Sequence, residues 1–240
     1  MTTLLALALL TPSASATNIA GTDKEPTCKY ASLAAAVAAA KSDGSTEIYL
    51  YNGGSVIHDT FGTIDFEVEV GPGNTTCSDF NWGTTVTIDG DGDRVANITG
   101  SSADVRFENL ILRDGSEING GVIRVRNGAW FDGVNLEIKN GTASNQGGCA
   151  MVTGTDTYAD FFDTLFNNCD ATGTDPGEGG GALAVVDGAH GGTSGESIIQ
   201  NSTALDGAGV YASGATTQLF LNGDCALNVA SNDGGCAYVD

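Results

Sequence analysis

Basic residues are scarce in this sequence. Nine lysines and arginines stand against 30 aspartates and glutamates, which gives a formal net charge of −21 at pH 7. Beyond Lys139 there is no lysine or arginine, whereas twelve acidic residues follow it. A nucleic-acid ligand needs cationic groups that neutralise its phosphates, so this composition excludes such a partner. It also disfavours an acidic polysaccharide unless calcium bridges the two.

Two further absences narrow the possibilities. No Cys-x-x-Cys spacing occurs, which argues against a zinc site or a redox motif. The apolar stretch at residues 1–16 is too short to span a membrane, and we expect no membrane span within the chain. Because this stretch ends in Ala14-Ser15-Ala16, it is typical of a secretory signal peptide. We therefore expect a secreted protein or one at the extracellular cell surface.

A repeat dominates the second half of the chain. Its five copies begin at glycines spaced by 27, 33, 27 and 27 residues, which are Gly120, Gly147, Gly180, Gly207 and Gly234. We place the six extra residues of the longer copy near residues 173–178, where Thr174-Asp175-Pro176-Gly177 is typical of a turn. A fixed period of this length without helical periodicity predicts a solenoid.

Two positions of the repeat are apolar in every copy and lie two residues apart, as inward-facing residues of a strand must. They are Ile123, Ala150, Leu183, Val210 and Ala237, and then Val125, Val152, Val185, Ala212 and Val239. The position between them varies and is expected to face solvent. It places Tyr211 and Tyr238 in adjacent copies, where they form the candidate ligand-binding pair, since glycans stack on exposed aromatic rings.

Asparagines recur before the glycine pairs and predict a ladder of side-chain amides at one corner. They are Asn140, Asn168, Asn201 and Asn228.

These segments resemble known repeats. Residues 104–115 and 135–145, with Gly180-Gly181-Ala182-Leu183, are similar to the right-handed parallel β-helix repeats of secreted bacterial surface proteins. Those proteins include the polymorphic outer-membrane type, whose signatures are Gly-Gly-Ala-aliphatic and Phe-x-x-Asn. The second signature occurs here only in degenerate form, as in Leu165-Phe166-Asn167-Asn168. The resemblance implies an all-β, pectin-lyase-like fold: a right-handed single-stranded parallel β-helix with an N-terminal capping helix.

The first part of the chain fits this organisation. Residues 32–41 are rich in alanine and predict the capping helix within a cap at 17–46, and the β-helix would occupy 47–240. Residues 63–70 alternate, which predicts one strand with Ile64, Phe66, Val68 and Val70 inward. Asp240 falls early in a new repeat. We therefore expect either a missing C-terminal continuation or an edge that stacks end to end on another chain.

Six cysteines remain after the signal peptide, an even number that suits an oxidising compartment. Cys149 and Cys236 share a column but lie three repeats apart, about 14 Å at a strand spacing of about 4.8 Å, too far for a disulfide. Local structural pairs are therefore favoured, namely Cys28 with Cys77, Cys149 with Cys169 and Cys225 with Cys236.

The run Asp89-Gly90-Asp91-Gly92-Asp93 is the candidate metal site, and calcium is the cofactor it would take. An EF-hand loop would need glutamate at its twelfth position, where this chain has Gly100, so a corner turn is the favoured interpretation. Arg124 and Arg126 face outward, and we expect ordinary surface ion pairs with Asp114, Asp132 or Glu137; a binding patch is the alternative.

We identify no catalytic residues. His190 lacks the Gly-His-Gly and paired aspartates of polygalacturonases, and His58 stands alone before Asp59. The favoured function is a non-enzymatic module for adhesion or glycan contact, whose partners would be glycans or a host or neighbouring cell surface. A carbohydrate-active enzyme of the pectin-lyase-like class is the alternative, and a structural stalk is the third interpretation.

Overall fold

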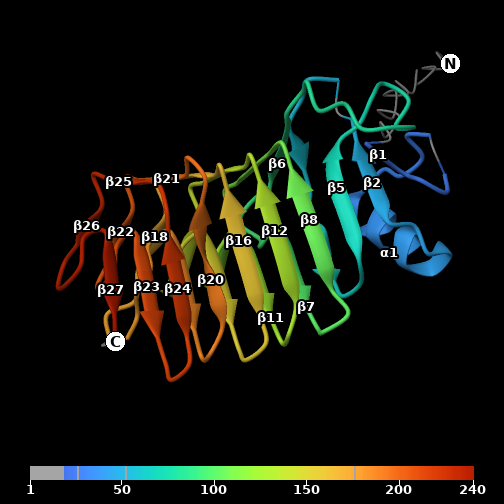
Figure 1. The fold of residues 1–240 in the computed structure, drawn as a ribbon. Helices are drawn as coiled ribbons and strands as arrows, with labels where there is room; N and C mark the ends of the chain where they lie inside the picture. The colour runs from blue at the N-terminus through green and yellow to red at the C-terminus, as the bar shows by residue number, and fades with distance from the viewer. Residues whose placement is uncertain (1–18, 26, 52, 176) are drawn as a thin grey trace, which may run out of the picture.

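The computed structural model describes residues 19–25, 27–51, 53–175 and 177–240. The described chain is all-β, with long parallel sheets and one helix, α1 (Leu33–Asp43) (Figure 1). The predicted signal peptide at residues 1–16 lies outside the described residues. Four sheets, here called I to IV, contain the strands.

Sheet I contains eight strands and is parallel except for its first pair. In spatial order they are β1 (Ala20–Thr22), β2 (Glu47–Leu50), β5 (Val68–Pro72), β8 (Asp104–Glu108), β12 (Trp130–Val134), β16 (Tyr158–Phe162), β20 (His190–Ser194) and β24 (Gln218–Leu221). Sheet II consists of β3 (Ile57–His58), β6 (Val86–Asp89), β9 (Leu110–Arg113), β13 (Glu137–Lys139), β17 (Leu165–Asn167), β21 (Ile198–Gln200) and β25 (Asp224–Ala226).

The other two sheets complete each repeat. Sheet III consists of β10 (Ser116–Asn119), β14 (Thr142–Gln146), β18 (Asp170–Ala171), β22 (Thr203–Ala204) and β26 (Val229–Ala230). Sheet IV consists of β4 (Gly62–Ile64), β7 (Ala96–Thr99), β11 (Ile123–Arg126), β15 (Ala150–Thr153), β19 (Leu183–Val186), β23 (Val210–Ser213) and β27 (Ala237–Val239).

From β8 onward the chain passes through sheets I, II, III and IV in that order and then returns to sheet I. Each strand therefore pairs with the equivalent strand of the next repeat. In sheet IV, Ile123 pairs with Ala150, Ala150 with Leu183, Leu183 with Val210 and Val210 with Ala237. This is the register that the apolar columns predict. The arrangement is compatible with a β-helix.

The glycine that opens each copy has a backbone conformation that requires glycine. All five have φ between 54° and 73°, in the left-handed region that side chains with a Cβ rarely adopt. This conformation turns the chain into the next strand of sheet IV, so the repeated glycine marks a corner.

The interior is apolar and contains a run of phenylalanines. Phe107, Phe131 and Phe161 are fully buried, and the ring of Phe131 lies 5.5 Å from that of Phe107 and 5.4 Å from that of Phe161. Gly133 pairs with both Phe107 and Phe161 along sheet I. Because glycine has no side chain, it leaves room for the Phe131 ring between the other two.

Helix α1 lies beside β1 and β2 at the N-terminal end of the stacked strands (Figure 1). The Ser32 side chain accepts a hydrogen bond from Ala35, and a carboxylate oxygen of Asp59 accepts one from the Leu33 amide at 2.6 Å. Gly44 ends the helix in the left-handed conformation. The sequence predicted residues 32–41, close to the observed bounds.

Three disulfides link the cysteine pairs that the sequence favoured. Their Cα–Cα distances are 4.9 Å for Cys28–Cys77, 5.4 Å for Cys149–Cys169 and 5.8 Å for Cys225–Cys236. Disulfides of this kind are typical of proteins that fold in an oxidising compartment.

Residues 63–70 do not form the single strand that their alternation predicted. They are divided between β4 and β5, which belong to sheets IV and I. Ile64, Val68 and Val70 are buried as expected, whereas Phe66 lies at the corner and is only partly buried. Alternation persists across the corner because the chain turns without changing which side chains face the interior.

The asparagine ladder forms only in part. Asn168 donates to Asn140, which donates to Asp114, and both asparagines have positive φ. Asn201 bonds Asn167 instead, and Asn228 donates to a backbone carbonyl.

The variable position of the repeat does not face solvent throughout, which corrects the prediction. Met151, Ala184 and Tyr211 are buried together on the outer side of sheet IV. The extra residues of the long copy lie between β18 and β19, as predicted, and cross this surface. Gln146 donates a hydrogen bond to the Gly177 carbonyl, and a Cβ built on Gly177 would lie 3.5 Å from the Tyr211 hydroxyl. The inserted loop therefore covers part of the column.

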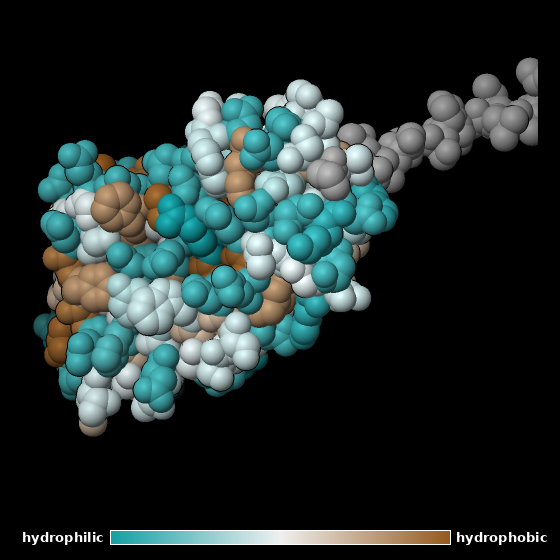
Figure 2. All heavy atoms as spheres, turned by 45° about the vertical axis from the view of Figure 1, so that its right-hand side comes forward, coloured by the Kyte–Doolittle hydropathy of each residue, from teal (hydrophilic) through white to brown (hydrophobic). Residues whose placement is uncertain are grey.

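The last repeat has an exposed apolar side. Figure 2 shows hydrophobic side chains gathered at the left-hand end of the molecule, the end at which β25, β26 and β27 lie in Figure 1. Leu227, Val229 and Val239 are exposed there. End-to-end stacking at this edge remains a prediction.

Candidate functional site

The predicted ligand-binding tyrosines form a stacked pair that is largely covered. The rings of Tyr211 and Tyr238 are 6.0 Å apart with an interplanar angle of 13°. Tyr211 is only 1% exposed, however, and Tyr238 is partly buried. The exposure expected of Tyr211 is therefore wrong, because the inserted loop shields its ring from an approaching glycan.

The predicted calcium residues do not converge as a group of three. Asp89 and Asp91 lie with His58 in a group whose ligand atoms are within 4.8 Å of one another, and Asp93 is not part of it. Asp89 is buried and forms an ion pair with Arg113, at 2.8 Å. Burial alone would raise the pKa of Asp89, but the backbone amide of Asp91 and the Arg113 guanidinium outweigh it and lower that pKa.

This geometry describes a corner more readily than a calcium cage. The Asp91 amide donates to the Asp89 carboxylate at 2.9 Å, as in a turn held by its own aspartate. Calcium takes six to eight oxygen ligands. An imidazole and a carboxylate already paired with arginine are poor substitutes, so a metal at this corner stays a prediction.

The side chains that do converge lie on the outer face of sheet I. One row runs across successive strands and consists of Glu47, Glu69, Arg106, Asp132 and Asp160, which pair in register. A second row beside it consists of Asp104, Trp130, Tyr158, His190 and Gln218. The two rows create two neighbouring hollows with different chemistry.

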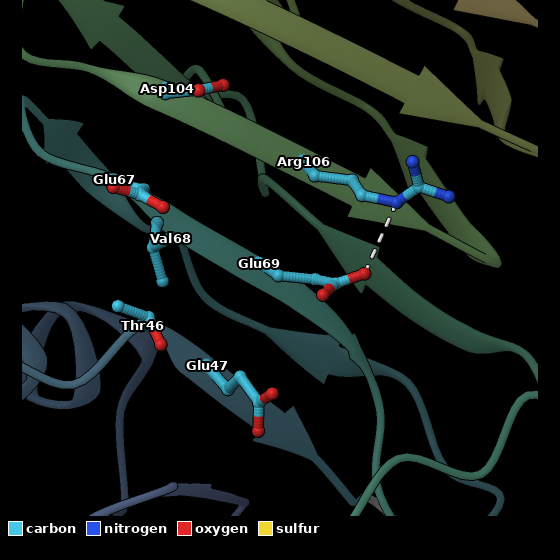
Figure 3. Close-up of a pocket in the computed structure, with 7 residues that line it drawn as sticks. All are labelled: Thr46, Glu47, Glu67, Val68, Glu69, Asp104 and Arg106. Atoms are coloured by element: carbon cyan, nitrogen blue, oxygen red, sulfur yellow. Dashed lines mark ion pairs between the residues drawn. The ribbon is translucent and has the colours of Figure 1, made fainter.

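The first hollow is acidic and is closed internally by ion pairs. It has a volume of about 230 Å³ and is lined by Thr46, Glu47, Glu67, Val68, Glu69, Asp104 and Arg106. Figure 3 shows Glu47, Glu69 and Arg106 projecting from β2, β5 and β8. Arg106 lies 3.2 Å from Glu69 and 2.6 Å from Glu108, so its charge is balanced within the protein.

The second hollow, of about 360 Å³, lies on the other side of Arg106 and is lined by Arg106, Asp132, Gly133, Val134, Asp160 and Phe162. Burial raises the pKa of Asp132, and repulsion from Asp160 and Asp104 adds to this, while Trp130 and Arg106 act in the opposite direction. Asp160 accepts hydrogen bonds from the Ser194 hydroxyl, at 2.7 and 2.8 Å to its two oxygens. Two carboxylates on adjacent strands thus have different environments.

Aromatic rings flank this hollow. Trp130 is 49% exposed and stacks on Tyr158, with ring centroids 4.2 Å apart and an interplanar angle of 30°. Tyr158 stacks in turn on Phe220 at 6.0 Å. Phe162 is 43% exposed at the opposite side of the aspartates. We call Trp130, Tyr158, Asp132, Asp160 and Phe162 the sheet I groove.

The raised pKa of Asp132 has a measurable consequence for stability. A carboxyl whose pKa is higher in the folded state than in the unfolded chain destabilises the fold once it ionises, above its ordinary pKa of about 3.9. We expect Asp132→Asn to raise the melting temperature at neutral pH and to have no such effect near pH 3, where the wild-type carboxyl is protonated in both states.

Thermal unfolding of both proteins across this pH range measures the effect. Asp156→Asn, at an exposed turn, is the control. An equal gain for Asp132→Asn at both pH values would contradict the assignment.

Sequence reasoning missed this groove, although a signal was present. Trp130 and Asp132 are each 28 residues before Tyr158 and Asp160, one repeat apart. Aligning the strands that precede the asparagine corner, as was done for those that follow the glycines, would have placed these residues side by side.

Arg124 and Arg126 do not form the predicted surface ion pairs. Asp114 pairs with Arg113, and Glu137 pairs with Lys139, so two of the three expected partners are engaged elsewhere. No carboxylate of the described residues lies within ion-pair distance of either arginine.

Within the described part of the chain, no helix combines the length and the apolar character that crossing a bilayer would require. No protein-family model matches the sequence, and neither the curated proteins nor the solved structures contain a match.

Proposed function

We propose that this chain is a secreted, right-handed single-stranded parallel β-helix that contacts glycans through the sheet I groove. The fixed passage through sheets I to IV supports the solenoid, and parallel crossover connections are right-handed in nearly all proteins. The three disulfides and the signal-like residues 1–16 support export. A surface or adhesive role follows from export together with a rigid, elongated scaffold.

The aromatic platform beside paired carboxylates is the observation that carries the proposal. The apolar face of a sugar ring packs on an exposed indole, and its hydroxyl groups donate hydrogen bonds to carboxylates. Trp130 offers the ring, and Asp132 and Asp160 offer acceptors on the two next positions of the same face. Because the local charge is negative, the groove suits a neutral glycan better than an acidic one.

Titration of the protein with a panel of soluble neutral oligosaccharides, followed by calorimetry, tests this proposal. We expect Trp130→Ala to weaken binding about tenfold or more, which corresponds to about 1.4 kcal/mol. Trp82→Ala is the matched control, since Trp82 is 42% exposed but does not line the groove. Equal affinities for both variants would place the glycan elsewhere. A panel without any binder would overturn the proposal and leave the structural stalk.

One observation favours a second candidate, hydrolysis of a glycosidic bond. Asp132 and Asp160 lie on adjacent strands, about 4.8 Å apart along the sheet, near the spacing of about 5–5.5 Å between the carboxyls of retaining glycosidases. Burial would keep Asp132 protonated as the acid, and the Ser194 hydroxyl would hold Asp160 ionised as the nucleophile.

New reducing ends released from the same panel distinguish this candidate from binding alone. If the chain hydrolyses a glycan, Asp160→Asn and Asp132→Asn should each abolish product while leaving the fold intact. Binding without product in the wild-type protein would exclude hydrolysis of the glycans in that panel.

A further inference from the structure

A second group of charged side chains lies on the outer face of sheet IV, away from the sheet I groove. Arg124 and Arg126 are two residues apart on β11, so their side chains project from the same face of the sheet. Asn97 on the neighbouring strand β7 pairs with Arg124. Arg94 lies just before β7, and electrostatic repulsion between its guanidinium and those of both other arginines indicates that the three are close together.

The distribution of ion pairs makes this group unusual. Seven of the nine basic residues lie within ion-pair distance of a carboxylate, namely Lys24, Lys29, Lys41, Arg94, Arg106, Arg113 and Lys139. The remaining two are Arg124 and Arg126, adjacent on one face, although the chain has 30 acidic residues. In so acidic a protein, two neighbouring arginines without a carboxylate are not expected from chance pairing of surface charges.

Arg94 is fixed in place and partly desolvated. Its side chain is 15% exposed, and it donates hydrogen bonds to the backbone carbonyls of Gly120 and Asn119 at 2.9 and 2.8 Å. Glu117 is its one carboxylate neighbour, at 3.5 Å. The group therefore has three positive charges and one negative charge, a local excess of about two.

Polar atoms of this group are buried without hydrogen-bond partners in the protein. They are the Nε atoms of Arg124 and Arg126 and the side-chain oxygens of Asn97 and Asn119. A buried N–H without a partner destabilises a fold by about 1–3 kcal/mol, more for a charged group. Burial, together with repulsion from Arg126 and Arg94, also lowers the pKa of Arg124. Both costs would be relieved by an anion that accepts from the guanidinium groups.

We propose that Arg94, Arg124 and Arg126 form a binding site for a doubly charged tetrahedral oxyanion, a sulfate or phosphate group, either as the free ion or as an ester. The local excess of two positive charges matches a dianion, and the planar guanidinium fork binds such oxygens in pairs. The net charge of −21 does not prevent this, since charges more than about 8 Å away are largely screened at physiological salt. This site is independent of the glycan groove on sheet I.

Calorimetric titration of the full chain with sodium sulfate, inorganic phosphate and a monosaccharide 6-sulfate, at constant ionic strength set with chloride, tests the proposal. We expect saturable binding with one site per chain. Arg124→Gln and Arg126→Gln should each weaken it at least tenfold. Arg124→Lys should weaken it less, because it keeps the charge but loses the fork. Lys139→Gln is the control, since it removes the same charge from a lysine that is paired with Glu137, and it should change affinity less than twofold.

The three ligands separate the two sources of the anion. Tighter binding of the monosaccharide sulfate than of free sulfate would assign the site to esters, and the reverse would assign it to the free ion. Circular dichroism spectra that match the wild type would show that the glutamine variants are folded. Absence of saturable binding by all three ligands, or equal affinities for Arg124→Gln and Lys139→Gln, would overturn the proposal.

Discussion

Replacing Phe131 with alanine is expected to lower the free energy of unfolding by about 3–5 kcal/mol. The Phe131 ring lies between those of Phe107 and Phe161 and is fully buried. Removing it takes away edge-to-face contacts on both sides and leaves a cavity between two repeats. The hydrogen-bonded strands of sheet I hold the neighbouring backbone at fixed spacing, so we expect the cavity to collapse only slightly.

Equilibrium unfolding in guanidinium chloride, with the slope compared between proteins, measures this loss. Phe162→Ala is the matched control, because Phe162 is 43% exposed on the next strand of the same sheet. We expect it to cost no more than about 1 kcal/mol. Similar losses for the two variants would mean that the phenylalanine run does not form the centre of the core.

Gly121→Ala is expected to destabilise the protein by about 3 kcal/mol or more, at the upper end of what overpacking usually costs. A Cβ at this position would lie 2.2 Å from the carbonyl oxygen of Gly148 and 2.5 Å from that of Thr142. Both are backbone atoms of the next repeat, so no side-chain rotation relieves the contact. The strands must separate locally, which weakens the bond from the Gly121 amide to Gly147.

The same unfolding experiment tests this expectation, with Gly83→Ala as the control. A Cβ on Gly83 would meet its nearest listed neighbour, Asn81 Oδ1, at 3.6 Å, an ordinary contact. Alanine there should be nearly neutral. A small effect of Gly121→Ala would show that adjacent repeats adjust their spacing easily, contrary to a rigid solenoid.

The two proposed sites divide the molecule by charge. The sheet I groove offers carboxylates and exposed rings, and the arginine group on sheet IV offers the unpaired positive charge of the described residues. A sulfated or phosphorylated glycan could therefore contact the two faces through different parts, whereas a neutral glycan would use sheet I alone. Comparing Trp130→Ala with Arg124→Gln on the same ligand separates these cases.

The sequence by itself determined the periodic features of this protein. Ile123, Ala150, Leu183 and Val210 align in one buried column because alternation within a strand and a period of 27 to 33 residues are both legible in one dimension. The three local cysteine pairs followed from the same geometry, since strand spacing limits how many repeats a disulfide can bridge.

Only the tertiary structure decided what each outer face exposes. Tyr211 occupies an outward position, yet the loop inserted one repeat earlier buries it. Arg124 and Arg126 have acidic residues nearby in sequence, yet Asp114 and Glu137 pair with other cations. Trp130 and Tyr158 stack because residues 28 apart become neighbours across two strands. Side-chain direction follows from local periodicity, whereas exposure and partners depend on which distant segments arrive at the same surface.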